Sequence, residues 1–356
     1  MHINPDIRHA ATLPAAFYRS EEVFERSKER IFAATWQYVA DQSVLQSPGE
    51  AYPFTLLPGV LEEPLVLTRD REGRDFALSN VCTHRGKIIV EQAGVYRQLS
   101  CGYHGRCFRH DGSFKSMPEF KDALDFPRPE DNLAQIPLRS WMGLLFVGLQ
   151  PEVSFEEMIR PVMERIGWMP LDTLVFDPTT SKDWPVKANW ALYCDNYLEG
   201  FHVPFVHPAL NQALVLEDYG YELFPYCNLQ LGVAKEGEPC FDIPKDAPDY
   251  GRRIYAYYYW LFPNLMLNFY PWGLSLNYVQ PLRHDRCLVR FRTYLFAGAQ
   301  GDRELNRIDQ TELEDEAVVE SVQLGVQSRY YKEGRFSPSQ EKGVHHFHSL
   351  IARFMG

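Results

Sequence analysis

The sequence predicts an α+β protein, because its hydrophobic pattern changes character twice along the chain. Residues 14–39 show helical spacing, and residues 38–149 form short alternating segments separated by turns that contain Gly or Pro. After Pro151, helical segments frame a series of strands that are rich in Tyr, Phe and Trp. A chain of 356 residues is long enough for two domains, or for one large domain with an insertion.

Local signals place the individual elements. Ser20 caps a helix, and Leu65–Thr68 and Phe76–Leu78 form a hairpin around the turn at residues 71–73. The strand Leu144–Val147 closes the all-β region. The later part of the chain predicts helix Phe155–Trp168, a strand with Trp184 and Val186, a helix from Ala188 to Tyr197, strands between Leu223 and Phe296, and helices Leu305–Tyr330 and Glu341–Phe354.

Charge and cysteine content limit the classes of function. A net charge of −11 argues against a nucleic-acid partner, because the chain has no excess of cations to neutralise phosphates. No run of 18 apolar residues is present, so we expect no membrane association through a spanning helix. Of the seven cysteines, all except Cys82 and Cys101 lack paired spacing, which indicates reduced thiols and a cytoplasmic protein.

Two short segments carry the first chemical signal. Residues 82–86 read Cys-Thr-His-Arg-Gly and residues 101–105 read Cys-Gly-Tyr-His-Gly, so each presents one thiolate and one imidazole. A Rieske [2Fe–2S] cluster has two Cys on one iron and two His on the other. Two Cys and two His also suit a structural zinc ion, but zinc fingers usually pair like with like. The alternation therefore favours a cluster whose ligands are Cys82, His84, Cys101 and His104.

The second chemical signal is the segment from Asp195 to His207. His202 and His207 are five residues apart, which puts them about 140° apart on an ideal helix. Pro204 lies between them and kinks the chain, so the second imidazole can turn back toward the first. Two histidines and one carboxylate form the facial triad of non-haem Fe(II) oxygenases, with open positions for O₂ and substrate. An isolated pair of histidines is more often packed or surface-exposed, and the upstream cluster segments favour the metal site.

Both motifs together resemble the catalytic α subunit of Rieske non-haem iron oxygenases, over nearly the whole chain. The resemblance implies an all-β Rieske domain at residues 38–150, inserted in a catalytic domain formed by residues 1–37 and 151–356. That catalytic domain has the helix-grip (START-like) fold, an antiparallel sheet flanked by helices. The residues that the resemblance implies are His202 and His207 as iron ligands, Glu199 as a carboxylate bridge to the cluster of a neighbouring subunit, and Asp195 as a polar residue beside the iron.

We expect the third iron ligand within residues 312–316, which read Glu-Leu-Glu-Asp-Glu at the start of the long late helix. Asp315 is the prediction, because it stands five residues before Glu320 as in the choline-monooxygenase-like branch of the family. Glu316 is the nearest competitor. A solvated acidic helix start, which the helix dipole favours, is the alternative for the whole cluster.

One position departs from the family pattern. Rieske oxygenases usually have Trp after Tyr-His-Gly, whereas this chain has Arg106 followed by Cys107. The change leaves the four cluster ligands intact and puts a positive charge near the cluster or its docking surface.

The resemblance implies a terminal oxygenase that uses O₂, a [2Fe–2S] cluster and mononuclear Fe(II) in mono- or dioxygenation. Electrons come from NAD(P)H through a separate flavin/iron–sulfur reductase, with or without a ferredoxin, and the subunits form a homotrimer. Residues 328–338 and 341–348 look like the choline monooxygenase, glycine betaine and carnitine oxygenase branch, which suggests a methylated amine as the small-molecule substrate. An aromatic-ring-hydroxylating dioxygenase and a Rieske electron-transfer protein without oxygenase activity are the alternatives.

The strand from Tyr255 to Phe262 bears on the substrate. Simple alternation puts Tyr255, Tyr257 and Tyr259 on one face and Tyr258, Trp260 and Phe262 on the other. One face could form an aromatic cage for a quaternary ammonium, and ordinary sheet packing explains the pattern equally well. The late histidines are expected on a helix surface or interface without a metal role; they are His345, His346 and His348.

Overall fold

The structure is a computed structural model that describes residues 1–298 and 302–356. The chain divides into two compact units, one formed by residues 33–151 and the other by residues 1–32 together with 152–356. The smaller unit is therefore inserted into the sequence of the larger one. In the described part of the chain, no helix is long and apolar enough to cross a membrane.

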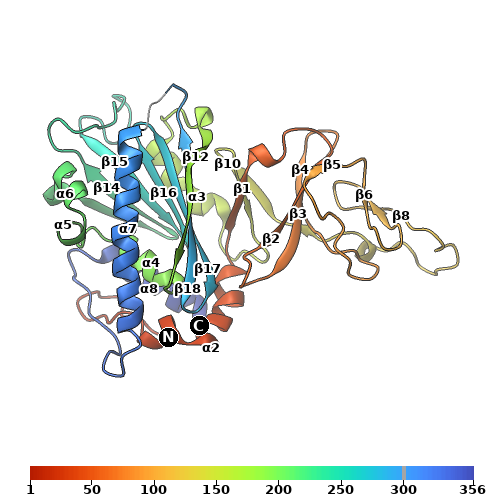
Figure 1. The fold of residues 1–356 in the computed structure, drawn as a ribbon, viewed down its shortest axis with the longest axis horizontal. Helices are drawn as coiled ribbons and strands as arrows, with labels where there is room; N and C mark the ends of the chain where they lie inside the picture. Colours follow the sequence, from red (N-terminus) through yellow and green to blue (C-terminus); the bar gives the residue numbers. More distant parts are fainter. Residues whose placement is uncertain (299–301) are drawn as a thin grey trace. The chain divides into compact units, whose positions relative to one another are not determined.

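The smaller unit consists of three antiparallel sheets and has no α-helix between residues 33 and 151 (Figure 1). The strand orders are β1–β11–β10, β5–β2–β3–β4–β9 and β6–β7–β8. The predicted hairpin is β3–β4, in which Leu67 pairs with Ala77. The strands are β1 (Gln37–Asp41), β2 (Glu50–Leu56), β3 (Glu63–Arg69), β4 (Asp75–Ser79), β5 (Gly94–Val95), β6 (Leu99–Ser100), β7 (Cys107–Phe108), β8 (Phe114–Ser116), β9 (Gln135–Ile136), β10 (Leu138–Trp141) and β11 (Leu144–Val147).

The larger unit is built on one antiparallel sheet of seven strands, in the order β12–β18–β17–β16–β15–β14–β13. Every residue of the inner strand β15 is buried, because helices cover both faces of the sheet. The strands are β12 (Val175–Val186), β13 (Gly220–Phe224), β14 (Cys227–Val233), β15 (Ile254–Leu261), β16 (Leu265–Tyr270), β17 (Gly273–Arg283) and β18 (Arg286–Leu295). The sheet with its helices confirms the expected α+β class and helix-grip architecture.

Helices of the larger unit divide between the two faces of the sheet. Arg165 of α3 pairs with Asp249, which also accepts a hydrogen bond from Tyr257, so α3 belongs to the Tyr257 face. Tyr197 of α4 bonds to Asn268 of β16 on the opposite face, and α7 runs along α4 there (Figure 1). The helices are α1 (Ala15–Arg19), α2 (Glu21–Ser27), α3 (Phe155–Ile166), α4 (Trp190–Tyr197), α5 (Val203–Val206), α6 (Pro208–Ala213), α7 (Asp302–Gly325) and α8 (Lys342–Met355).

The N-terminal segment is less regular than its hydrophobic spacing predicts. Ser20 ends α1 and its side chain caps α2 by accepting a hydrogen bond from Val23 N–H, so the expected cap is present. Residues 28–32 form a π-helical turn, and the helical region ends there, short of the expected residue 39. The helix stops because the chain must enter β1 at Gln37.

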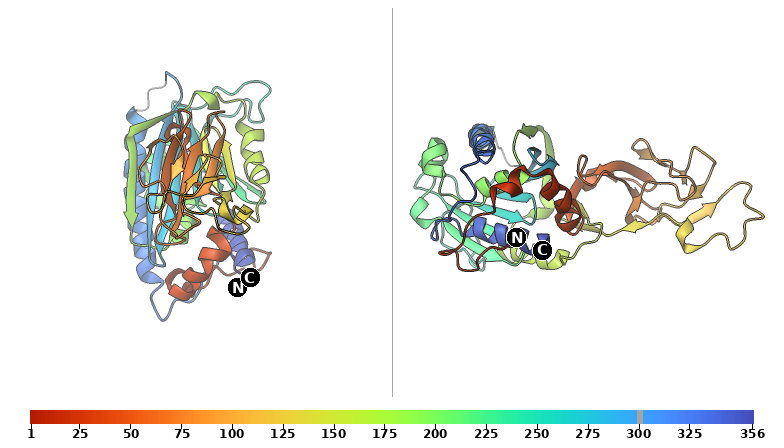
Figure 2. Two further views of the ribbon diagram at one scale, coloured as in Figure 1. Left: turned by 90° about the vertical axis from the view of Figure 1, so that its right-hand side faces the viewer. Right: turned by 90° about the horizontal axis from the view of Figure 1, so that it is seen from below.

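The two ends of the chain lie side by side on the larger unit (Figure 2). Ala15 N–H donates to the carbonyl of Lys332, and Leu13 N–H donates to Nδ1 of His348 on α8. The N-terminal segment is thus held by the last 25 residues of the chain, from Lys332 to Gly356.

Candidate metal centres and substrate cavity

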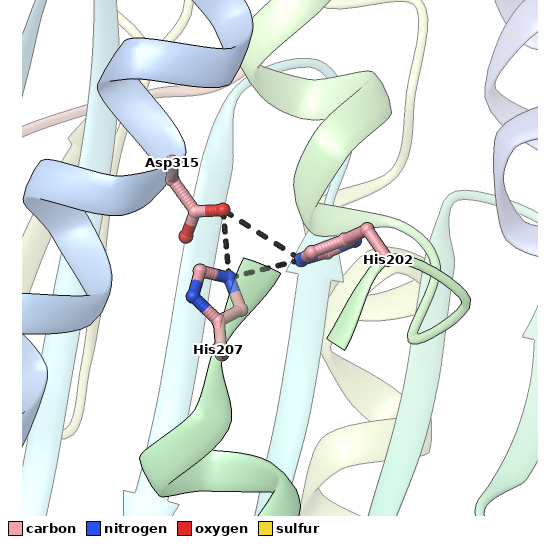
Figure 3. Close-up of side chains that lie close together, drawn as sticks. All are labelled: His202, His207 and Asp315. Carbon is pink, nitrogen blue, oxygen red and sulfur yellow. Dashed lines mark hydrogen bonds and ion pairs between the residues drawn. The ribbon is translucent and has the colours of Figure 1, made fainter. Parts of the chain in front are cut away.

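His202, His207 and Asp315 converge on one point although they come from three places in the chain (Figure 3). Nε2 of His202 lies 3.2 Å from Nε2 of His207. Oδ1 of Asp315 lies 2.9 Å from Nε2 of His207 and 3.6 Å from Nε2 of His202. Two imidazole nitrogens and one carboxylate oxygen in this arrangement suit a facial set of ligands around one divalent metal ion.

A carboxylate orients each imidazole from its far side. Nδ1 of His202 lies 2.6 Å from Oε1 of Glu199, and Nδ1 of His207 lies 2.8 Å from Oε2 of Glu314. A carboxylate at Nδ1 keeps the proton there and leaves Nε2 available for a metal. Burial alone lowers the pKa of His207, but its hydrogen bonds to Asp315 and Glu314 outweigh burial and raise that pKa.

The sharp turn between the two histidines comes from proline. α5 contains only the four residues Val203–Val206, with Pro204 in its first turn. The backbone leaves the helical conformation at His207, and Pro208 then begins α6. The chain therefore bends between the histidines, as the sequence predicts, and both Nε2 atoms face the same point.

The acidic cluster at residues 312–316 lies inside α7, because the helix already begins at Asp302. The expectation of an acidic helix start was wrong, and the helix dipole cannot stabilise these carboxylates. They have separate surroundings instead: Asp315 and Glu314 contact His207, and Glu312 accepts a hydrogen bond of 2.5 Å from Tyr193 Oη. Burial and the nearby Glu320 raise the pKa of Glu316, whose Oε1 has no hydrogen-bond partner among the described residues.

The two cluster segments of the smaller unit have the same backbone hydrogen-bond pattern. In each, the Cys N–H donates to the carbonyl five residues later, and the N–H of the Gly four residues later donates back to the Cys carbonyl. These residues are Cys82, Gly86 and Lys87 in one segment and Cys101, Gly105 and Arg106 in the other. Gly86 and Gly105 have φ values of 71° and 73°. A residue with a side chain could adopt these values only with backbone strain. The repeated turn presents one Cys and one His side chain from each segment.

The side chains of these segments gather as a cluster site requires. Burial, together with the neighbouring Cys101 thiol, raises the pKa of Cys82, and the rings of His84 and His104 lie 4.7 Å apart. Nδ1 of His84 is buried and has no hydrogen-bond partner in the described structure. Because an unpaired buried nitrogen costs free energy, this atom indicates a ligand that the polypeptide does not supply. Two thiols and two imidazoles at one place fit a [2Fe–2S] cluster.

Arg106, which replaces the usual Trp, is buried and does not form part of an exposed docking surface. Its Nη2 lies 2.5 Å from Oδ1 of Asp131. Its guanidinium group lies 5.2 to 5.8 Å from the ring centres of Phe108, Phe114 and Phe126. Three aromatic rings therefore lie around the charged group. Cation–π attraction and one ion pair offset the free-energy cost of removing the charge from water.

Asp195, which we expected as a polar residue beside the iron, bonds to residues from both ends of the chain. Its Oδ2 accepts a hydrogen bond from Tyr18 Oη, and its Oδ1 lies 2.8 Å from Nε2 of His348. His348 is 1% exposed and thus belongs to the core, contrary to the expected surface position. Asp195 therefore joins α4 to α8 and to the N-terminal segment, while Glu199 faces His202.

A cavity in the larger unit opens beside His202, His207 and Asp315. Its wall is rich in tyrosine and includes Glu312. The lining residues are Tyr193, Asn196, Tyr197, Glu199, His202, Val203, His207, Ala209, Leu210, Ala213, Tyr219, Gln230, Tyr255, Tyr258, Asn268, Tyr270, Ser275, Asn277, Phe291, Thr311, Glu312 and Asp315.

Strand β15 departs from the predicted alternation. Tyr255 and Tyr258 both line the cavity, although they are an odd number of residues apart. The pairing with β14 runs from Ala256 opposite Gly232 to Ile254 opposite Val233, so Tyr255 is left in a bulge and turns to the cavity side. The sequence prediction that Tyr255 shares a face with Tyr257 was therefore wrong.

Two protein-family models match the chain. The model for the ring hydroxylating alpha subunit (catalytic domain) matches residues 163–356, and the model for the Rieske [2Fe-2S] domain matches residues 35–137. The first of these covers more than half of the chain.

Similar proteins agree with these matches. The carnitine monooxygenase oxygenase subunit of Escherichia coli (strain K12) is 29% identical, over 97% of this chain and 94% of that protein. Chloroplastic choline monooxygenase of Arabidopsis thaliana is 28% identical, over 97% of this chain and 83% of that protein. A solved quaternary ammonium Rieske monooxygenase has a TM-score of 0.79 at 25% identity and covers 99% of this chain and 97% of its own. Naphthalene 1,2-dioxygenase from Rhodococcus sp. shares the fold, with a TM-score of 0.74 at 20% identity and coverage of 97% and 94%.

The chain belongs to the family of ring-hydroxylating oxygenase alpha subunits. It is accordingly the terminal oxygenase component of a Rieske-type system, an oxidoreductase with a [2Fe–2S] cluster and a mononuclear iron. It uses O₂ as a co-substrate and receives electrons from a reductase. Oxygenases of this family act on small molecules and form oligomers.

Proposed function

We propose that this terminal oxygenase oxidises a small methylated or quaternary amine, either by hydroxylation or by oxidative N-demethylation. The observation that carries the proposal is the tyrosine-rich cavity beside His202, His207 and Asp315. Tyrosine rings attract alkylated ammonium groups through their faces. The names of the similar choline, carnitine and quaternary ammonium monooxygenases support the same substrate class.

The roles of the residues follow from their positions. His202 and His207 would hold Fe(II) through Nε2 and Asp315 through Oδ1, and Glu199 and Glu314 orient the two imidazoles. Bound iron supplies the site for O₂ activation, and one oxygen atom enters a substrate C–H bond while the other leaves as water with two electrons and two protons. Asp315 is favoured over Glu316 because Oδ1 of Asp315 faces both Nε2 atoms.

The smaller unit would serve as the Rieske domain, with the proposed boundaries at residues 38 and 150. Its cluster ligands would be Cys82, His84, Cys101 and His104, and the larger unit would be the catalytic domain. NAD(P)H would supply electrons through a flavin/iron–sulfur reductase, with or without a ferredoxin. The free cysteines favour a cytoplasmic location for this system.

Metal content tests the ligand assignment. Anaerobically purified protein should be red-brown, with about three irons and two sulfides per chain. His202→Ala, His207→Ala and Asp315→Ala should each remove one iron and all product formation while the cluster spectrum stays unchanged. Glu316→Ala is the matched control and should keep both the iron and the activity. Full turnover by Asp315→Ala together with an inactive Glu316→Ala would move the third ligand by one residue.

Oxygen uptake tests the substrate class. A panel of choline, betaines, carnitine and aromatic acids, supplied with a reductase and NAD(P)H, should show uptake coupled to product only with methylated amines. Coupled uptake with aromatic acids alone would favour a ring-hydroxylating dioxygenase. A reducible cluster without uptake on any compound would favour an electron-transfer protein.

Glu199 has a further proposed role as the electron bridge in a homotrimer. Its carboxylate already bonds to Nδ1 of His202, and in a head-to-tail ring it would also meet a cluster histidine of the next subunit, His104 by our assignment. Glu199→Gln should leave both metal sites loaded and the cluster reducible, yet nearly stop its reoxidation by O₂ in the presence of substrate. Unchanged single-turnover reoxidation, or a fully active monomer, would contradict the bridge.

A further inference from the structure

Glu312 is a buried carboxyl group that the iron triad does not use. It lies on α7 one turn before Asp315, its side chain lines the cavity, and the residue is only 3% exposed. Its Oε2 accepts a hydrogen bond from Tyr193 Oη. Its Oε1 is buried and has no hydrogen-bond partner among the described residues.

The described surroundings of Glu312 offer no lysine or arginine that explains its burial. Within the described residues, the cavity lining includes neither Lys nor Arg. Burial raises the pKa of Glu312, and the neighbouring carboxylates of Asp315, Glu316 and Asp309 raise it further. The hydrogen bond from Tyr193 lowers the pKa but does not outweigh these effects. A buried acid in this state destabilises the fold, and such groups in cavities are commonly retained for a ligand.

The rest of the cavity also suits a cation better than an anion. The rings of Tyr255 and Tyr258 lie 5.9 Å and 6.0 Å from the ring of Tyr270, so three aromatic side chains form one wall. Two amide donors of the cavity wall are already used, and the first is Asn268, whose Nδ2 donates to Ser275 O and to Asn277 Oδ1. Likewise, Gln230 Nε2 donates to the carbonyl of Tyr197.

On the basis of the proposed function, we infer that Glu312 contacts the substrate and provides the counter-charge for its ammonium group. A cation beside a carboxyl group favours the ionised form, so the bound ammonium offsets the effect of burial on Glu312. The cavity therefore selects cations without a carboxylate over zwitterions such as betaines. Because Glu312 and Asp315 are one helical turn apart on the same side of α7, an ammonium beside Glu312 places its N-methyl groups next to the triad.

Binding to the anaerobic holoenzyme, measured by calorimetry, tests this inference without turnover. The probes are choline, its neutral isostere 3,3-dimethylbutan-1-ol, and glycine betaine. Wild-type protein should bind choline at least about tenfold more tightly than either of the others, since one ion pair in a partly polar site is worth a kcal/mol or more. Glu312→Gln keeps the size of the side chain and should remove the preference for choline over the neutral alcohol.

Glu316→Gln is the matched control, because Glu316 is also partly buried on α7 with an unpaired oxygen but does not line the cavity. It should bind all three probes as the wild type does. Equal binding of choline and the alcohol by wild-type protein, or an unchanged preference in Glu312→Gln with normal cluster absorbance and iron content, would overturn the inference. The two proposals can fail separately. If the wild type prefers choline over the neutral alcohol but no methylated amine supports oxygen uptake, the role of Glu312 is supported and the proposed reaction is rejected.

Discussion

The proposed iron triad (His202, His207 and Asp315) and the two cluster segments hold their histidines in different electrostatic surroundings. At the triad, the carboxylates of Glu199 and Glu314 bond to the two Nδ1 atoms, and Oδ1 of Asp315 lies 2.9 Å and 3.6 Å from the two Nε2 atoms. At the cluster segments, burial lowers the pKa of His84, and the neighbouring His104, Arg85 and Arg106 lower it further. With the proposed ligands, carboxylates lie around the position of a divalent cation, whereas Arg85 and Arg106 lie near a sulfur-rich cluster that becomes more negative on reduction.

The largest expected effect changes the charge on the cluster side. His84→Cys replaces a neutral imidazole by a charged thiolate, so the reduction potential of the cluster should fall by roughly 200 mV or more. A redox titration followed by EPR measures this potential. Thr83→Ser leaves the ligand set in place and should leave the potential unchanged; an equal shift in both variants would contradict the assignment of His84 as a ligand.

Arg106→Leu removes the buried cation beside the cluster segments. The variant removes the ion-pair partner of Asp131, which keeps the hydrogen bond from Arg128 N–H, so the free energy of unfolding should fall by about 2–3 kcal/mol. We expect less than the full cost of a broken buried pair, because the Asp131 side chain is 22% exposed. Denaturation with urea, followed by loss of the cluster absorbance, provides the measurement. Arg109→Leu, an exposed neighbour, should change stability by no more than about 0.5 kcal/mol.

Glu314→Ala removes the carboxylate that orients His207. The affinity for iron should fall by about 10- to 100-fold, because an imidazole without its hydrogen-bond partner is a less well-oriented ligand. Iron retained after dialysis against graded chelator concentrations measures the change, with the cluster absorbance as an internal reference. Glu316→Ala should retain iron as the wild type does. Equal loss in both variants would mean that the helix, and not the bond to His207, determines the affinity.

The smallest expected effect concerns pH. Unfolded Glu312 ionises near its ordinary pKa, whereas the folded protein holds its pKa well above that value, through burial first and then the nearby acids. The free energy of unfolding of the wild type therefore falls as pH rises above about 4.5. At pH 7, Glu312→Gln should be more stable than the wild type by about 1 kcal/mol and should unfold at a higher temperature. Near pH 4 the two proteins should not differ. Among the residues whose side chains the structure describes, the titratable groups that face Glu312 are Tyr193 of α4, Cys287 of β18, and Asp309, Asp315 and Glu316 of α7. Equal melting temperatures of the two proteins at pH 7 would contradict a raised pKa.

Local chemistry explains which parts of the site could be predicted from the sequence. Each cluster segment is five residues long, and the bend between His202 and His207 depends on one intervening proline, so spacing alone was informative. The role of Glu314 depends on which face of α7 packs against His207, a contact between residues more than 100 positions apart. The position of Tyr255 depends on a bulge that is set by pairing with β14, and the burial of His348 depends on a segment more than 300 residues away. Such long-range packing leaves no mark in a short stretch of sequence.

The order of the two units along the chain has a consequence for biosynthesis. Residues 33–151 form one continuous segment of the chain. Because the ribosome makes the chain from the N-terminus onward, this unit can fold before the rest of the chain is complete. Residues 1–32, in contrast, must wait for the last helix, because Leu13 and Tyr18 find their partner His348 only near the end of synthesis. The N-terminal segment is thus the first to be made and among the last to dock, and any truncation that removes α8 should release both ends of the larger unit together.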